Sequence, residues 1–144
     1  MSNVFNVNEV LGNNVELGDN NTITRGTLGD TIIGDGVKTD CGVHIAHNSF
    51  VGKNSMLAAH AMISGSVTIG ADVQIGGQVG IAQHVTIGDG AVLTARSGVT
   101  KDVLPNAQMA GFPAVEAGQY WREVAALRRV FKSSGATRKN TEQQ

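Results

Sequence analysis

The chain has 144 residues, a formal net charge of −1, 19 glycines and a single cysteine, Cys41. A near-zero charge argues against a nucleic-acid-binding protein, because such proteins carry a clear excess of basic side chains. One cysteine excludes an internal disulfide framework and fits a reducing compartment. No apolar run is long enough to span a bilayer, and the first residues lack the apolar core of a signal peptide. We therefore expect one cytoplasmic domain with at most peripheral membrane contact.

Aliphatic residues recur at every sixth position through most of the chain. From Ile33 to Val99 only Thr39 interrupts this series, and a small or β-branched residue stands four positions after each member. A period of six fits neither an amphipathic helix nor an open sheet. It predicts an all-β fold in which short strands alternate with sharp corners and wind into a parallel β-helix. About sixteen hexads, three to a coil, predict about five coils and a height of about 25 Å.

The same series begins earlier, at Phe5, Leu11, Leu17 and Ile23. Ten residues rather than six separate Ile23 from Ile33, so four extra residues lie within 24–31. We expect these residues to bulge out at one corner without interrupting the stack.

The six-residue rhythm stops after Val103. Pro105 and the G-F-P run at 111–113 predict a turn region. Residues 116–132 have helical periodicity, and we expect their apolar stripe to pack on the β-helix. That stripe consists of Tyr120, Val124, Leu127 and Phe131. The predicted organisation is a β-helix over 1–104, a turn and helix over 105–132, and a polar, disordered tail over 133–144.

Charge is distributed unevenly along the chain. Residues 1–115 carry five Lys or Arg and nine Asp or Glu, whereas residues 116–144 carry six and three. The basic C-terminal part is either a solvated helix face or a docking surface for an acidic partner.

All four histidines fall in one part of the chain and none occupies an inward position of the hexads: His44, His47, His60 and His84. Asp40, seven residues before His47, could hold one nitrogen of that ring and leave the other free as a general base. Gly65 lies 18 residues after His47, one coil above it, where its N–H could stabilise an oxyanion. His84 lies 37 residues after His47, about 10 Å up the same side. The alternatives are an inert surface histidine, a turn aspartate and an ordinary corner glycine.

Several motifs together carry a resemblance to a known family. They are T-R-G-T-L-G-D-T-I-I-G-D-G-V at 24–37, I-A-H-N at 45–48, S-G-S at 64–66, I-G-G at 75–77, I-A-Q-H at 81–84, and G-F-P followed by Y-W-R at 120–122. Over residues 10–132 the chain resembles the UDP-3-O-acylglucosamine N-acyltransferases of lipid A synthesis, which are hexapeptide-repeat enzymes.

That resemblance implies a left-handed β-helix that forms a homotrimer with active sites between neighbouring subunits. It implies His47 as general base, Asp40 as its acidic partner, Gly65 as oxyanion donor and His84 as second active-site histidine. It further implies substrate contacts at Asn48, His44 and Gly98.

The same resemblance implies the reactants. The donor would be an acyl group on the phosphopantetheine of acyl carrier protein, or on CoA, and the acceptor the amine of an amino sugar. No metal and no tightly bound cofactor is expected. The carrier would dock on the basic side chains of the C-terminal helix, Arg122, Arg128, Arg129 and Lys132.

The sequence also departs from the family. We find no counterpart of its N-terminal uridine-binding domain, so we expect free UDP to bind weakly. Thr24 replaces the family's usual Asp, and His60 stands where a small residue is usual. Gly98 lies near a position that in some members carries a bulky side chain limiting acyl length.

Three other functions fit a six-residue repeat. Zinc enzymes of the γ-carbonic anhydrase class resemble the chain in their hexads, but their His-x4-His pair is missing around His47 and His84. An acetyl-CoA-dependent sugar acetyltransferase would use the same base, and residues 111–114 resemble its G-x-P-A turn near CoA. A non-catalytic structural trimer is the third.

Overall fold

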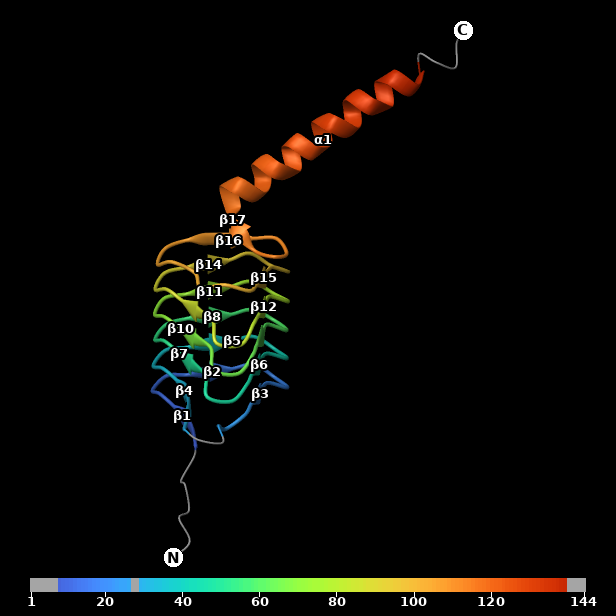
Figure 1. Ribbon diagram of the computed structural model, residues 1–144. Coiled ribbons are helices and arrows are strands. Elements are labelled where there is room, and N and C mark those ends of the chain that lie inside the picture. Colours follow the sequence, from blue (N-terminus) through green and yellow to red (C-terminus); the bar gives the residue numbers. More distant parts are fainter. Residues whose placement is uncertain (1–7, 27–28, 140–144) are drawn as a thin grey trace, which may run out of the picture.

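The computed structural model describes residues 8–26 and 29–139, with side chains up to residue 131. The chain is a left-handed parallel β-helix followed by a single helix, α1 (Ala117–Lys139) (Figure 1). Short strands form three sheets along the faces of a triangular prism, with the N-terminal coil at the bottom of Figure 1 and α1 at the top. The expected fold class is confirmed.

The strands follow each other around the prism, so that up to β15 every third strand belongs to one sheet. Sheet A contains β1 (Glu9–Leu11), β4 (Thr31–Ile33), β7 (Phe50–Val51), β10 (Thr68–Ile69) and β13 (Thr86–Ile87). Sheet B contains β2 (Glu16–Leu17), β5 (Lys38–Thr39), β8 (Met56–Leu57), β11 (Gln74–Ile75), β14 (Val92–Leu93), β16 (Gln108–Ala110) and β17 (Val115–Glu116). Sheet C contains β3 (Thr22–Ile23), β6 (His44–Ile45), β9 (Met62–Ile63), β12 (Gly80–Ile81) and β15 (Gly98–Val99).

The register of the ladders confirms the six-residue repeat. Phe50 pairs with Thr68, 18 residues on, whereas Val10 pairs with Ile32, 22 residues on. The four extra residues between β3 and β4 therefore leave the ladder unbroken, as expected. Five complete coils are present, and a partial sixth is made by Val103, which bridges Ile87, and by β16, which pairs with β14.

The interior of the prism is filled by the inward residues of the hexads. From the second coil on, their aliphatic side chains are almost all between 0% and 5% exposed, whereas Leu11 and Leu17 in the first coil are 50% and 41% exposed. Each buried Val, Leu or Ile contributes roughly 1.5–3 kcal/mol. Serines that occupy inward positions are satisfied by the backbone: Ser49 Oγ donates to Ser64 O at 3.1 Å, and Ser55 Oγ donates to Gly70 O at 2.9 Å. The core is therefore closed, and chemistry must occur on the outer faces or corners.

The chain turns at three corners in each coil. The A–B corner consists of residues 34–37, 52–55, 70–73 and 88–91, and the B–C corner of 40–43, 58–61, 76–79 and 94–97. The C–A corner consists of 24–30, 46–49, 64–67 and 82–85. Many corners contain a non-glycine residue in the left-handed region, where Asn, Asp and His are tolerated best. At the C–A corner these residues are Asn48, Ser66 and His84, with φ of 59°, 60° and 62°.

The C-terminal part differs from the sequence-based expectation. The parallel ladder continues past residue 104 into β16, and α1 continues past residue 132 to Lys139, into the stretch expected to be disordered. A helix that is already nucleated extends at low cost through residues such as Lys, Ala and Arg, even where they are polar. Residues 140–144 of the expected tail lie outside the described residues.

Only the first residue of the apolar stripe of α1, Tyr120, packs on the end of the prism, against Gly111, and the rest of the stripe does not, which contradicts the expectation. The helix projects obliquely from the end of the stack (Figure 1) and contacts β16 and β17 chiefly. Trp121, Leu127 and Phe131 are 60%, 61% and 68% exposed. The reason is connectivity: α1 follows β17 directly, so only its first turn can reach the prism. No described helix is both long enough and apolar enough to cross a membrane.

Candidate functional site

The C–A corner stacks the residues of interest on successive coils. The N–H of Ser66 donates to His47 O at 2.9 Å, and the N–H of His84 donates to Gly65 O at 3.2 Å. His47, Gly65 and His84 therefore lie on three consecutive coils of one corner, as their spacing predicted. The side chains of His47 and His84 are exposed, because corner residues point away from the core.

The imidazole of His47 lies directly against the backbone of Gly65. A methyl group at position 65 would lie 2.5 Å from Cε1 and 2.7 Å from Nε2 of that ring, so only glycine allows the ring to take this position. Among the described residues nothing accepts the Gly65 N–H. An ionisable ring and an available backbone donor are thus one coil apart, which is the combination that general-base acyl transfer needs.

The other nitrogen of His47 faces the next residue in the chain. Nδ1 lies 3.1 Å from Oδ1 of Asn48. The backbone N–H of Asn48 donates to Thr31 Oγ1 at 3.0 Å, and its Nδ2 donates to Gly29 O at 3.4 Å. Asn48, which was expected to contact substrate, therefore also contacts the His47 ring.

Asp40 lies at the B–C corner, one corner before His47 and separated from it by β6. Its carboxylate accepts the N–H of Cys41 at 2.7 Å. Seven residues are one hexad plus one, and each hexad carries the chain to the next corner, so the two residues do not stack. The described chain does not bring Asp40 to His47.

The remaining expected substrate contacts, His44 and Gly98, lie on the outer face of sheet C. His44 is in β6, where it pairs with Met62, and Gly98 is in β15, where it pairs with Gly80. His60 lies instead at the B–C corner, and its ring lies against Gly42, where a methyl group would be 2.5 Å from Nδ1.

A shallow trough of about 260 Å³ follows the outer face of sheet C. Its floor includes Gly80 and Gly98, and nothing lies within 4 Å of the position where Gly80 would carry a methyl group. Ser64 and Ala82 line the end next to the C–A corner, and the ring of Phe112 packs on Gly98 at the other end. The trough therefore runs from the neighbourhood of Gly65 to an aromatic stop.

Sequence reasoning missed the role of Phe112 at this trough. The residue is 82% exposed and follows Gly111, which has a φ of +88°. Glycine at two successive outward positions of sheet C, 80 and 98, was the available signal, because outward positions elsewhere carry larger side chains.

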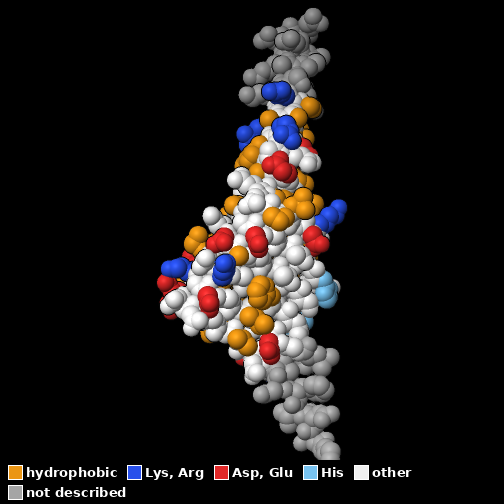
Figure 2. All heavy atoms as spheres, turned by 90° about the vertical axis from the view of Figure 1, so that its left-hand side faces the viewer, with side chains coloured by type: hydrophobic (Ala, Val, Ile, Leu, Met, Phe, Trp, Pro, Cys, Tyr) orange, Lys and Arg blue, Asp and Glu red, His pale blue; other side chains and the backbone are white. Residues whose placement is uncertain are grey.

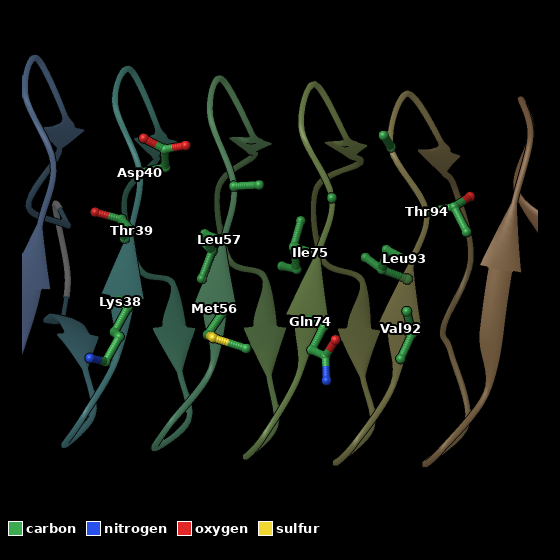
Figure 3. Close-up of a pocket in the computed structure, with 13 residues that line it drawn as sticks. Lys38, Thr39, Asp40, Met56, Leu57, Gln74, Ile75, Val92, Leu93 and Thr94 are labelled. Atoms are coloured by element: carbon green, nitrogen blue, oxygen red, sulfur yellow. The ribbon is translucent and has the colours of Figure 1, made fainter.

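A larger hollow of about 570 Å³ lies on the outer face of sheet B. Figure 3 shows its outward row, Lys38, Met56, Gln74 and Val92, with Asp40 at the adjoining corner. None of the four histidines lines it. It is wide open and holds no imidazole, so size alone does not make it a reactive site.

The basic side chains expected to dock a carrier lie on α1. Arg122, Arg128 and Arg129 are exposed, whereas Lys132 lies in the part of α1 whose side chains are outside the described residues. Arg128 and Arg129 line a hollow with Trp121, Val124, Ala125 and Phe131.

At the start of α1 the N–H of Gln119 donates to Glu116 Oε2 at 2.9 Å. The backbone N–H groups of Gly118 and Gln119, helped by the nearby Arg122, lower the pKa of Glu116 below its ordinary 4.5.

No three His, Cys, Asp or Glu side chains converge as metal ligands within the described ranges.

Comparisons with known proteins agree with this architecture. Residues 30–65 and 66–101 match the family described as bacterial transferase hexapeptide (six repeats). The chain is 48% identical over 118 residues to a UDP-3-O-acylglucosamine N-acyltransferase of Rhizobium meliloti, covering 82% of this chain and 33% of that protein. It is 43% identical over 121 residues to the same-named protein of Methylobacterium nodulans, covering 84% and 34%. The chain thus spans about a third of the length of these relatives.

Solved structures give the same result. The UDP-N-acetylglucosamine acyltransferase from Campylobacter jejuni superposes with a TM-score of 0.74 at 32% identity, over 86% of this chain and 54% of that one. LpxA from Acinetobacter baumannii gives 0.73 at 30% identity, over 75% and 43%. The resemblance to UDP-3-O-acylglucosamine N-acyltransferases is confirmed in sequence, and the chain belongs to the bacterial transferase hexapeptide family.

Proposed function

We propose that this protein is a cytoplasmic N-acyltransferase of lipid A-type synthesis that moves an acyl group from a phosphopantetheine thioester to the amine of an amino sugar. The observation that carries the proposal is the His47 imidazole lying against the backbone of Gly65, beside the trough on sheet C. The names of the relatives, which are acyltransferases of UDP-linked amino sugars, support the substrate class.

The chemistry follows from the placement of the two ring nitrogens of His47. Because Nδ1 faces Asn48, Nε2 is the nitrogen that accepts a proton from the attacking amine. The amine adds to the thioester carbonyl, and the Gly65 N–H stabilises the oxyanion of the tetrahedral intermediate. That intermediate collapses with cleavage of the carbon–sulfur bond, and the imidazolium returns its proton to the leaving thiolate.

The outer face of sheet C supplies the acyl site in this proposal. The trough begins beside Gly65 and has a glycine floor, so an alkyl chain can lie along it with its carbonyl at the C–A corner. Phe112 over Gly98 limits how far that chain extends. His44 lies lower on the same face, and His84 lies one coil above Gly65, where it can contact the acceptor sugar.

The proposal includes a homotrimer with its sites between subunits. One chain leaves Asp40 at a different corner from His47, so Asp40 acts as acidic partner only if a neighbouring subunit brings its carboxylate to Nδ1, beside the Asn48 amide. Sheet A also exposes an apolar outward row, Val10, Ile32 and Phe50, at 42%, 36% and 41%. Burying that row in an oligomer would be favourable. A monomer at micromolar concentration in a sedimentation experiment would contradict this part.

We propose acyl carrier protein as donor, because the exposed arginines of α1 suit an acidic partner. The test is a mass-spectrometric assay that offers acyl groups of several lengths, on carrier protein and on CoA, to UDP-linked and free amino sugars. We expect an N-acyl product with a marked preference for the carrier. Efficient use of acetyl-CoA would identify a CoA-dependent sugar acetyltransferase instead, and absence of any product with every pair would favour a structural role.

A further inference from the structure

We propose that the four-residue insertion between β3 and β4 sets the tautomer of His47, and that it acts through the amide of Asn48. The inference rests on the proposed role of His47 as base. It assigns Gly26, Gly29 and Asn48 as residues that position the His47 ring, in addition to their place in the turns.

The first step is the contact between His47 and Asn48. Nδ1 of the ring lies 3.1 Å from Oδ1 of Asn48. An amide oxygen can only accept a hydrogen bond, so Nδ1 must carry the proton and Nε2 must hold the lone pair. The reverse orientation of the amide would present an NH₂ donor to the ring. It would then favour the opposite tautomer, in which Nε2 carries the proton and cannot act as a base.

The second step is what fixes the orientation of the amide. Nδ2 of Asn48 points at the carbonyl oxygen of Gly29 in the insertion, 3.4 Å away. A carbonyl can only accept, so the NH₂ group must face the insertion and the oxygen must face His47. Gly26 completes the cradle, because a methyl group there would collide with Nδ2 of Asn48 and with the Gly29 oxygen.

The third step is how the insertion is held against Asn48. Thr31, which is 0% exposed, ends the insertion. Its hydroxyl donates to Thr24 O at 2.7 Å and accepts the backbone N–H of Asn48 at 3.0 Å. One buried hydroxyl therefore ties both ends of the insertion to the corner that carries His47.

Asn54 shows that an asparagine at such a corner does not itself need an insertion. It lies at the A–B corner with a φ of 56°, close to the 59° of Asn48. Its Nδ2 donates to Asp72 on the next coil at 3.2 Å, and no extra residues surround it. The insertion lies next to the turn that carries His47, whereas the turns that carry His60 and His84 have none, as expected if its role is to orient the His47 ring alone.

The test is imidazole nitrogen NMR on the full-length, ¹⁵N-labelled protein near neutral pH without substrate. We expect His47 in the wild type to show the Nδ1–H tautomer. Gly26→Ala, which displaces the amide, and Asn48→Leu, which removes it, should both move His47 toward the Nε2–H tautomer. Asn54→Leu is the matched control, because it removes a corner asparagine with the same backbone conformation and should leave the His47 signals unchanged.

Kinetics add an independent readout in the same four proteins. Gly26→Ala and Asn48→Leu should lower kcat by at least about 10-fold, and by no more than the 10²–10⁴-fold expected for losing the base itself, with little change in the KM for the donor. A wild-type tautomer in both variants would overturn the inference, whatever their activity. A changed tautomer with unchanged kcat would support the inference and overturn the role of His47 as base. Two variants are needed because Gly26→Ala alone can disturb folding, which the melting temperature would show.

Discussion

The C–A and A–B corners have similar backbone conformations but carry side chains of different chemistry. Both place an asparagine in the left-handed region, Asn48 and Asn54. At the A–B corner aspartates cap backbone donors, as where Asp89 accepts the N–H of Ala71 at 2.8 Å. At the C–A corner the same frame presents His47 against Gly65 and His84 above. On the side of the prism seen in Figure 2, acidic and basic side chains are scattered and histidines appear only at one edge.

The comparison teaches where function can reside in such a repeat. Inward positions must be aliphatic or small at every coil, and corner backbones must turn, so both are determined by folding. The side chains two and three places after an inward residue are not part of the core. The difference between corners at these positions is therefore the most direct indication of a site.

The largest expected effect comes from exchanging the residue that distinguishes the two corners. His47→Ala should lower turnover by about 10²–10⁴-fold, because a positioned base is lost, while the melting temperature stays nearly the same. Lys53→Ala is the matched control, since Lys53 occupies the same place in its hexad at the A–B corner and is also exposed. The measurement is steady-state kinetics of both variants. Full activity in His47→Ala would show that the C–A corner does not carry the base.

A smaller loss should follow from moving the ring without removing it. Gly65→Ala introduces a methyl group 2.5 Å from Cε1 of His47, so the imidazole must shift. A displacement of about 1 Å can cost about 10²-fold in rate. Gly77→Ala is the control at the B–C corner, because its nearest neighbour would be 3.4 Å away. Equal activities of the two variants would show that the contact between His47 and Gly65 is incidental.

The carrier preference tests a region outside both corners. Arg128→Glu with Arg129→Glu should slow acyl transfer from carrier protein by roughly 10-fold at low salt and leave transfer from CoA unchanged, because steering by long-range charge is lost. Lys53→Glu with Lys101→Glu changes the net charge equally on the prism and should have little effect. An initial-rate series at rising ionic strength would refute docking on α1 if the wild-type rate did not fall.

The smallest effect concerns the start of α1. The pKa of Glu116 is lowered by the backbone N–H groups that its carboxylate accepts, so the folded pKa lies below the unfolded one. Its contribution is therefore present above the unfolded pKa and disappears as the pH falls through the folded one. Glu116→Gln should reduce the helical signal in circular dichroism slightly at pH 7 and not at all at pH 2. The rate of acyl transfer should be the same in Glu116→Gln as in the wild type.

The spacing of residues predicted everything that the six-residue frame controls. It located the inward series, the insertion and the stacking of His47, Gly65 and His84. It placed Asp40 one corner before His47 but could not say whether the carboxylate reaches the ring, because one chain alone does not bring the two side chains together. The spacing could not predict the contact between Phe112 and Gly98, because Phe112 lies in an irregular turn that follows no repeat. The stripe on α1 showed which face is apolar but not whether the prism would be within reach.

The most direct measurement is a titration of ¹⁵N-labelled protein with an acyl-pantetheine thioester, followed by amide chemical shifts. If the C–A corner and its trough hold the acyl group, the amides of Ser64–Ser66 and Ala82–His84 should shift, together with those of Gly80 and Gly98. The A–B corner amides of 52–54 and 70–72 should stay in place. Shifts confined to the A–B corner, or to the row of Met56, Gln74 and Val92 on sheet B, would contradict the assignment of the site.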